Sequence, residues 1–125
     1  MSAAAGTIDG QGVVAVFVTV PDKEAAEKVA RALLEPKLAA CVNILPGVES
    51  WYEWEGSLQQ DQELLLMIKS RRSLLDSITA AVVQAHPYDV PEVISTAVDG
   101  GNPAYLDWVR ANAQGPPLGG PPLGG

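Results

Sequence analysis

The residues best suited to chemistry lie in one short segment, HPYDVPE, at residues 86–92. His86 is the only histidine of the chain, and a neutral imidazole nitrogen is a good ligand for copper, zinc or nickel. Asp89 and Glu92 add carboxylates that can ligate a metal or orient the imidazole. Alternatively, both are solvated turn residues without a functional role. His86 could instead be a capping residue that hydrogen-bonds the last carbonyls of a helix. Spacing alone favours that alternative, since no second histidine accompanies it.

Cys41 is the second potential metal ligand. It is the only cysteine, so the chain contains no internal disulfide. A thiolate binds soft metals such as Cu(I), but one thiol does not complete a site, so His86, Met67 or a neighbouring subunit would have to supply further ligands. The alternative is a small hydrophobic residue in a strand, and we expect Cys41 to be too buried to bind a metal without rearrangement.

The elements that must position these residues follow from the apolar pattern. The sequence predicts a β-branched strand over residues 13–20, then a helix capped by Asp22 and stopped by Pro36. A second strand over 38–45 continues, past a bend at Pro46 and Gly47, into a ribbon with a turn near Gly56. A strand over 63–70, an amphipathic helix over 74–86, a strand over 90–98 and a short helix starting at 102–103 complete the order.

This βαββαβ order with a terminal helix predicts an α+β, ferredoxin-like sandwich, in which both main helices cover one face of an antiparallel sheet. Residues 63–68 read ELLLMI, without the polar alternation of a strand that has one face in water. Because helices of the same chain cover only one face, we expect the other face to meet another subunit. Trp51, Tyr52 and Trp54 cannot all point to one side of a strand, and interface packing is their expected role.

Bulk composition limits the remaining possibilities. The 125 residues fit one domain, expected over 13–114, between a flexible N-terminal segment (1–12) and a flexible Pro/Gly-rich tail (115–125). The net charge of −7 argues against a nucleic-acid partner, and no apolar stretch reaches the roughly 18 residues of a membrane span. Without a secretion signal, the expected location is the cytoplasm, or an organelle stroma or matrix if a targeting peptide has been removed.

Three segments in this order, KLAACVNILPGVESWYEWEG, HPYDVPEVI and GNPAYLDWV, resemble the signature segments of the CutA divalent-cation tolerance family. The resemblance spans about residues 13–110 and implies a trimer of ferredoxin-like subunits, similar in architecture to the PII signalling proteins. It also implies association with metal tolerance and copper binding. Two mild departures are Ala97, where the family often has proline, and Asp89, where it commonly has glutamate.

The resemblance implies a homotrimeric protein that binds copper or similar divalent metal ions and takes part in the response to metal. We expect the metal, Cu(II) or another divalent transition metal, to bind through His86, Glu92 and Cys41. The cleft between subunits is expected to contain Trp54, Lys69, Tyr88 and Asp89, with Lys69 as an ion-pair partner of a carboxylate or an anion-binding group. The alternative function is a PII-like signalling or scaffolding trimer whose cleft binds a small ligand or a partner protein. No nucleophile elbow, P-loop or dinucleotide fingerprint is present, so neither an enzyme nor an organic cofactor is expected.

Overall fold

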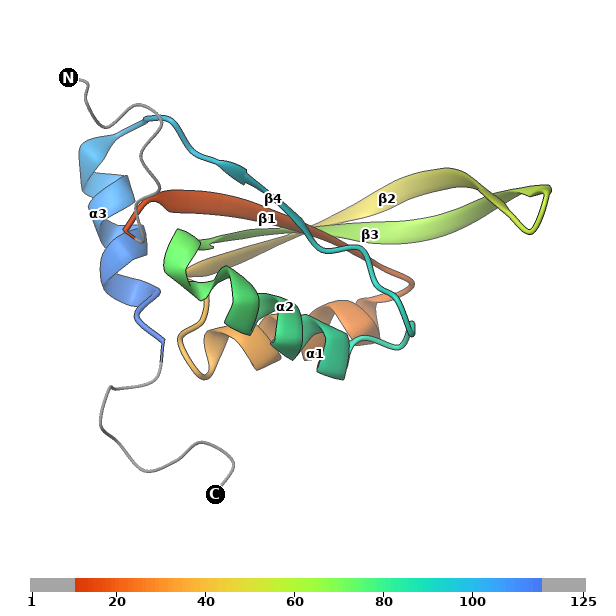
Figure 1. Cartoon of the computed structure of the whole chain (residues 1–125), viewed down its shortest axis with the longest axis horizontal. Helices are drawn as coiled ribbons and strands as arrows, with labels where there is room; N and C mark the ends of the chain where they lie inside the picture. The colour runs from red at the N-terminus through yellow and green to blue at the C-terminus, as the bar shows by residue number, and fades with distance from the viewer. Residues whose placement is uncertain (1–10, 116–125) are drawn as a thin grey trace.

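Two helices cover one face of a four-stranded antiparallel sheet in the computed structural model, which describes residues 11–115 (Figure 1). The strand order is β2-β3-β1-β4, and every neighbouring pair is antiparallel. This arrangement confirms the predicted ferredoxin-like βαββαβ fold. The elements are β1 (Val13–Val20), α1 (Lys23–Leu34), β2 (Cys41–Trp54), β3 (Ser57–Arg71), the 3₁₀ helix η1 (Arg72–Leu74), α2 (Leu75–Ala85), β4 (Ile94–Ala97) and α3 (Pro103–Asn112).

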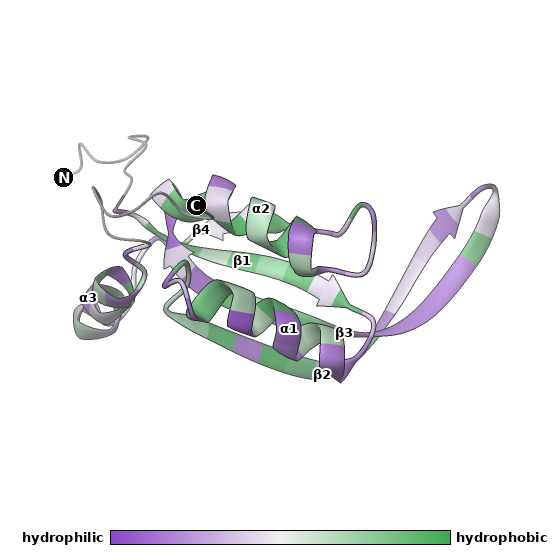
Figure 2. Cartoon of the chain, turned by 90° about the horizontal axis from the view of Figure 1, so that it is seen from below, coloured by the Kyte–Doolittle hydropathy of each residue, from purple (hydrophilic) through white to green (hydrophobic). Residues whose placement is uncertain are grey.

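The core lies between the sheet and the helices α1 and α2, which lie side by side on the same face (Figure 2). Residues paired across neighbouring antiparallel strands point to the same side of the sheet. The pairs Val18–Leu66 and Val16–Ile68 therefore share the helix side, where all four side chains are fully buried. The apolar strand β3 thus contributes Leu66 and Ile68 to the core of its own chain, and not to a contact with another subunit.

The opposite face of the sheet is only partly covered. Phe17, Leu65 and Met67 alternate with the core residues and are half-buried, while Leu45 and Ile94 are exposed. The face left open by the helices is therefore apolar along three strands and into β4, as the continuous apolar run of residues 63–68 predicted.

A long hairpin ribbon projects from the sheet, formed by the second half of β2 and the first half of β3 (Figure 1). The register shifts between Leu45 and Val48, which confirms the bend expected at Pro46 and Gly47. Gly47 has φ 81, a left-handed conformation that glycine adopts without a side-chain clash. The hairpin turn lies at Glu55 and Gly56, close to the position that the sequence predicted.

Two element boundaries differ from the prediction. β2 begins at Cys41 and not at residue 38, because the amides of Leu38 and Ala39 both bond the carbonyl of Leu33 and close the end of α1. β4 contains only Ile94–Ala97 of the predicted 90–98. Pro91 has no amide hydrogen to give to a ladder, so residues before the strand run as a loop.

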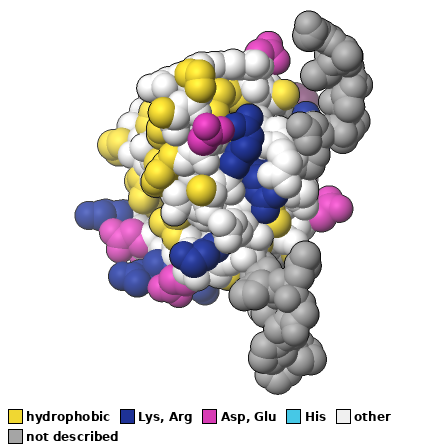
Figure 3. All heavy atoms as spheres, turned by 90° about the vertical axis from the view of Figure 1, so that its left-hand side faces the viewer, with side chains coloured by type: hydrophobic (Ala, Val, Ile, Leu, Met, Phe, Trp, Pro, Cys, Tyr) yellow, Lys and Arg dark blue, Asp and Glu magenta, His cyan; other side chains and the backbone are white. Residues whose placement is uncertain are grey.

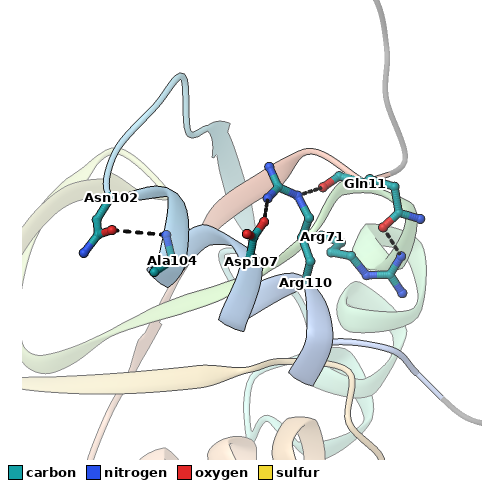
Figure 4. Close-up of polar contacts among 6 residues, drawn as sticks. All are labelled: Gln11, Arg71, Asn102, Ala104, Asp107 and Arg110. Atoms are coloured by element: carbon teal, nitrogen blue, oxygen red, sulfur yellow. Dashed lines mark hydrogen bonds and ion pairs between the residues drawn. The ribbon is translucent and has the colours of Figure 1, made fainter.

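Both ends of the described chain are anchored at the end of the sheet that carries α3. The Gln11 carbonyl accepts a hydrogen bond from Arg110 (2.9 Å) and its side chain accepts one from Arg71 (3.1 Å) (Figure 4). Asp107 pairs with Arg110 at 3.0 Å. Gly115, placed by the sequence in a flexible tail, is buried and donates to the Lys37 carbonyl at 2.8 Å. The predictions for residues 1–10 and 116–125 lie outside the described residues.

Charged side chains of both signs are exposed at this same end of the molecule (Figure 3). Figure 3 faces that end and shows Lys and Arg side chains interspersed with Asp and Glu, beside hydrophobic ones. The hairpin ribbon leaves the sheet at the other end (Figure 1). The acidic residues described next lie at the ribbon end.

Candidate functional site

A cleft of about 620 Å³ lies where the hairpin ribbon leaves the sheet, beside the loop that follows α2. Its lining contains four carboxylates and three aromatic rings. Among the residues that the structure describes, none of those lining it is basic. The lining residues are Thr19, Tyr52, Trp54, Gln59, Asp61, Glu63, Tyr88, Asp89, Val90 and Glu92.

The ribbon forms one wall of the cleft through strand alternation. Successive side chains point to opposite sides of a strand, so Tyr52 and Trp54 face the cleft while Trp51 does not. This confirms that the three ribbon aromatics do not share one side. The indole of Trp51 instead donates to Glu49 at 2.8 Å. On the paired strand, the same alternation brings Gln59, Asp61 and Glu63 to the cleft.

The loop after α2 forms the other wall and is joined to the ribbon by one hydrogen bond. The hydroxyl of Tyr88 donates to Glu63 at 3.0 Å, and Glu63 is only 8% exposed. Burial, together with this bond and the nearby carboxylate charge, raises the pKa of Tyr88 to about 12. Tyr88 therefore keeps its proton at neutral pH and stays a donor to Glu63.

Tyr52 makes the equivalent contact within the ribbon. Its hydroxyl donates to Asp61, and this hydrogen bond is the largest cause of the raised pKa of Tyr52. Both cleft tyrosines thus share hydrogen bonds with cleft carboxylates. Among the described residues, no basic side chain forms an ion pair with any of the cleft carboxylates.

His86 lies behind the Tyr88 wall, and both of its ring nitrogens are engaged. Nε2 lies 2.7 Å from the Thr19 carbonyl, and Nδ1 lies 3.1 Å from the Tyr88 amide. A carbonyl only accepts and an amide N–H only donates, so the ring is neutral with its proton on Nε2. The buried imidazole also contacts the Tyr88 ring, with centroids 4.7 Å apart. His86 therefore ties the loop to β1 and orients Tyr88.

This geometry changes two interpretations of His86. The side chain does not bond the last carbonyls of its helix, as the alternative had it, but a carbonyl of β1. It also has no nitrogen lone pair open to a metal while the Tyr88 amide is bound. His86 lines a separate depression of about 350 Å³ with Asp22, Glu24 and Lys28, and not the cleft.

Cys41 and Lys69 lie elsewhere on the sheet. They are directly paired, whereas Thr19, which holds His86, is paired with Leu65. Four residues of β3 therefore separate the two positions, about 13 Å along the strand. Within one chain, Cys41 does not converge with His86 and Glu92.

Cys41 is less buried than predicted, and the role of Lys69 in a cleft between subunits stays a prediction. Cys41 is half-buried, and its Sγ lies 3.9 Å from Lys69 Nζ. Burial, and then the nearby Cys41, raise the pKa of Tyr105. Lys69 is outside the cleft and hydrogen-bonds Asn43; within the described residues it forms no ion pair with a carboxylate.

The cleft thus contains some predicted residues and several that the sequence reasoning missed. Trp54, Tyr88 and Asp89, which were predicted for a cleft between subunits, and Glu92, which was predicted as a metal ligand, line this cleft within one chain. Tyr52 was considered only as an interface residue, and Asp61 and Glu63 were not singled out. The signal that could have found them is alternation: Asp61 and Glu63 are two residues apart on the strand that pairs with the aromatic ribbon.

Fold and site together define a class of protein: a ferredoxin-like α+β domain with a projecting β-ribbon and an acidic, aromatic cleft at the ribbon's base. Residues 14–112 match the family model described as CutA1 divalent ion tolerance protein. The chain therefore belongs to the CutA1 family, as its three signature segments predicted.

Individual relatives agree with this assignment. The chloroplastic protein CutA of Arabidopsis thaliana is 54% identical over 101 residues, which cover 81% of this chain and 56% of the relative. The divalent-cation tolerance protein CutA of Thermus thermophilus is 46% identical over 97 residues, covering 78% and 94%. The crystal structure of CutA1 from Oryza sativa has a TM-score of 0.80 and 51% identity, covering 82% of this chain and 94% of that one. The chain spans a little over half the length of the plant relatives it matches.

One chain does not hold a complete metal site in its described part. Across residues 11–115, no three His, Cys, Asp or Glu side chains lie close enough together to coordinate an ion.

No helix in that range is long and apolar enough to cross a membrane.

Proposed function

We propose that this chain acts in divalent-cation tolerance as a homotrimer that binds copper or a similar divalent ion. Membership of the CutA1 family supports the tolerance role. The observation that carries the binding role is the cleft lining, in which four carboxylates face a common space without a basic neighbour among the described residues. The negative potential of clustered carboxylates raises the local concentration of cations. The proposal is that of a binding protein and not of an enzyme.

The metal site we propose is completed between chains. Each chain contributes Glu92 and Asp89 from the loop wall, while a neighbouring chain supplies the remaining donors, for which Cys41 is a candidate because it is half-buried on an edge strand. His86 takes part only if its bond to the Tyr88 amide opens. The cytoplasm or an organelle stroma is the proposed location, and two plant relatives carry chloroplastic names.

Calorimetric titration tests the metal role. Cu(II), Zn(II) and Mn(II) are titrated into the wild type, into Glu92→Gln and into Glu53→Gln, which removes the same charge from an exposed ribbon residue outside the cleft lining. We expect Glu92→Gln to weaken binding by about tenfold or more, because an amide oxygen is a poorer ligand than a carboxylate. Glu53→Gln should bind like the wild type. Equal affinities in all three proteins, or no saturable binding of any ion, would contradict the proposal.

A further inference from the structure

The buried carboxylate of Glu63 is the starting point. Glu63 is 8% exposed and lines the cleft, and one of its oxygens accepts the Tyr88 hydroxyl. Within the part of the chain that the structure describes, the other oxygen has no hydrogen-bond donor and the carboxylate has no ion-pair partner. A buried carboxylate that is left half-satisfied costs free energy, which a donor bearing positive charge would recover.

The rest of the cleft selects the kind of cation. Tyr52, Trp54 and Tyr88 bring three aromatic rings to the same space, and aromatic faces attract organic cations by cation–π interactions. A cleft of about 620 Å³ is within the usual size range for small-molecule sites and larger than a single metal ion requires. Asp61 and Glu63 lie on the ribbon wall, and Asp89 and Glu92 lie on the loop wall. Negative charge is thus present on two walls.

We propose that this cleft binds a small organic dication whose two ends are primary ammonium groups, that is, an aliphatic diamine or polyamine. One ammonium donates to the free oxygen of Glu63 and lies against the rings of Tyr88 and Trp54. The other end pairs with the carboxylates of the loop wall. A quaternary ammonium group fits less well, because it has no N–H to satisfy Glu63. The four carboxylates that this chain places in the lining disfavour an anionic ligand.

This inference goes beyond the proposed metal role but uses the same cleft, so the two ligands should compete. The measurement is therefore made in the presence of a metal chelator. 1,6-Diaminohexane and hexamethonium are the probes, since they share a six-carbon chain and a double charge and differ in whether the nitrogens carry hydrogens. Each is titrated calorimetrically into the full chain, with the indole signals followed by NMR.

We expect saturable binding of the diamine and binding of hexamethonium that is weaker by about tenfold, the factor that one charged hydrogen bond supplies. Glu63→Gln keeps the acceptor for Tyr88 and removes the charge, and should weaken diamine binding by about tenfold or more. Glu53→Gln lies on the same ribbon outside the cleft lining and should change affinity by less than about twofold. Trp54→Leu alters an exposed ring and should weaken binding about two- to fivefold even if Glu63→Gln does not fold.

The inference is overturned if the diamine shows no saturable binding up to about 10 mM. It is also overturned if hexamethonium binds as tightly as the diamine, or if the cleft variants and Glu53→Gln have equal effects. The diamine titration contains the chelator and the copper titration does not, so the two roles are measured separately. If copper binds but the diamine does not, only this inference is overturned. Loss of copper binding with intact diamine binding overturns only the metal role.

Discussion

At the scale of single residues, the pair of Tyr88 and Glu63 connects the two walls of the cleft. The pKa of Tyr88 is about 12 in the folded chain, above its ordinary value near 10, since burial and then Glu63 disfavour the phenolate. The folded state therefore prefers the neutral phenol. Its contribution to stability is complete below about pH 10 and is lost as the pH rises toward 12.

Tyr88→Phe should lower the free energy of unfolding by about 1 kcal/mol at pH 8, since Glu63 loses a hydrogen bond in a buried position. It should also show a smaller further decline between pH 10 and 12 than the wild type, because the titrating group is gone. Urea unfolding at several pH values measures both effects. Identical declines in the two proteins would show that Tyr88 does not titrate as described.

His86 gives a second residue-scale prediction. Replacement by alanine removes the bonds to Thr19 and Tyr88 and the ring contact, so we expect a loss of about 2 kcal/mol of unfolding free energy. ¹⁵N NMR of the wild type should show the neutral tautomer protonated on Nε2. A ring found protonated on Nδ1 at neutral pH would contradict the assigned bonds and would leave Nε2 available to a metal.

The sequence allowed the cleft residues to be predicted only in part. The HPYDVPE segment marked Tyr88, Asp89 and Glu92, because polar groups are dense there. It did not reveal that His86 turns away to Thr19, since that bond joins residues 67 positions apart in the chain. Asp61 and Glu63 read as ordinary ribbon residues until the hairpin register placed them opposite the loop.

At the scale of elements, helix caps, bends and turns were predicted correctly, because residues close together in the sequence determine them. The Asp22 cap, which accepts from the Ala25 amide at 2.8 Å, and the Asn102 cap followed by Pro103 both hold in the structure. The Pro46-Gly47 bend and the turn at Gly56 hold as well. Failures occurred at the start of β2 and the extent of β4, where pairing with distant strands and the closing bonds to Leu33 decide the boundary.

The C-terminal boundary supplies the element-scale prediction. Gly115 has φ 72 and donates to Lys37, so a chain ending after Gly115 should be more stable than one ending after Gln114 by about 1 kcal/mol. For a domain of this size that difference is a few degrees in Tm. Gly115→Ala in the full chain should also destabilise it, because its Cβ would lie 3.1 Å from Leu74 and the conformation is strained. Equal melting of the two truncated chains would show that the contact is not a stabilising one.

At the scale of the whole molecule, the uneven distribution of apolar surface argues for assembly. The ribbon exposes Trp51 by 57% and Leu58 by 71%, and the open face of the sheet adds Leu45 and Ile94. Large exposed apolar surfaces of this kind mark interaction sites. A charge in the apolar strand β3 would not probe this assembly: Leu66→Asp would unfold the chain, since Leu66 is fully buried in its own core.

The homotrimer we propose is best tested on the ribbon. Sedimentation equilibrium of the wild type should give three times the 13.1 kDa of one chain. Trp51→Glu places a charge on the side of the ribbon away from the cleft. It should weaken association by about 2 kcal/mol or more, because loss of an aromatic residue at the centre of an interface has a cost of this size. Val83→Glu is the matched control, because it adds the same charge to an apolar residue, 47% exposed, on the helix layer. We expect Val83→Glu to keep the wild-type mass while Trp51→Glu dissociates on dilution. A wild-type mass of one chain would contradict both the homotrimer and the metal site completed between chains. Equal masses for the two variants at every concentration would show that the ribbon is not part of the interface.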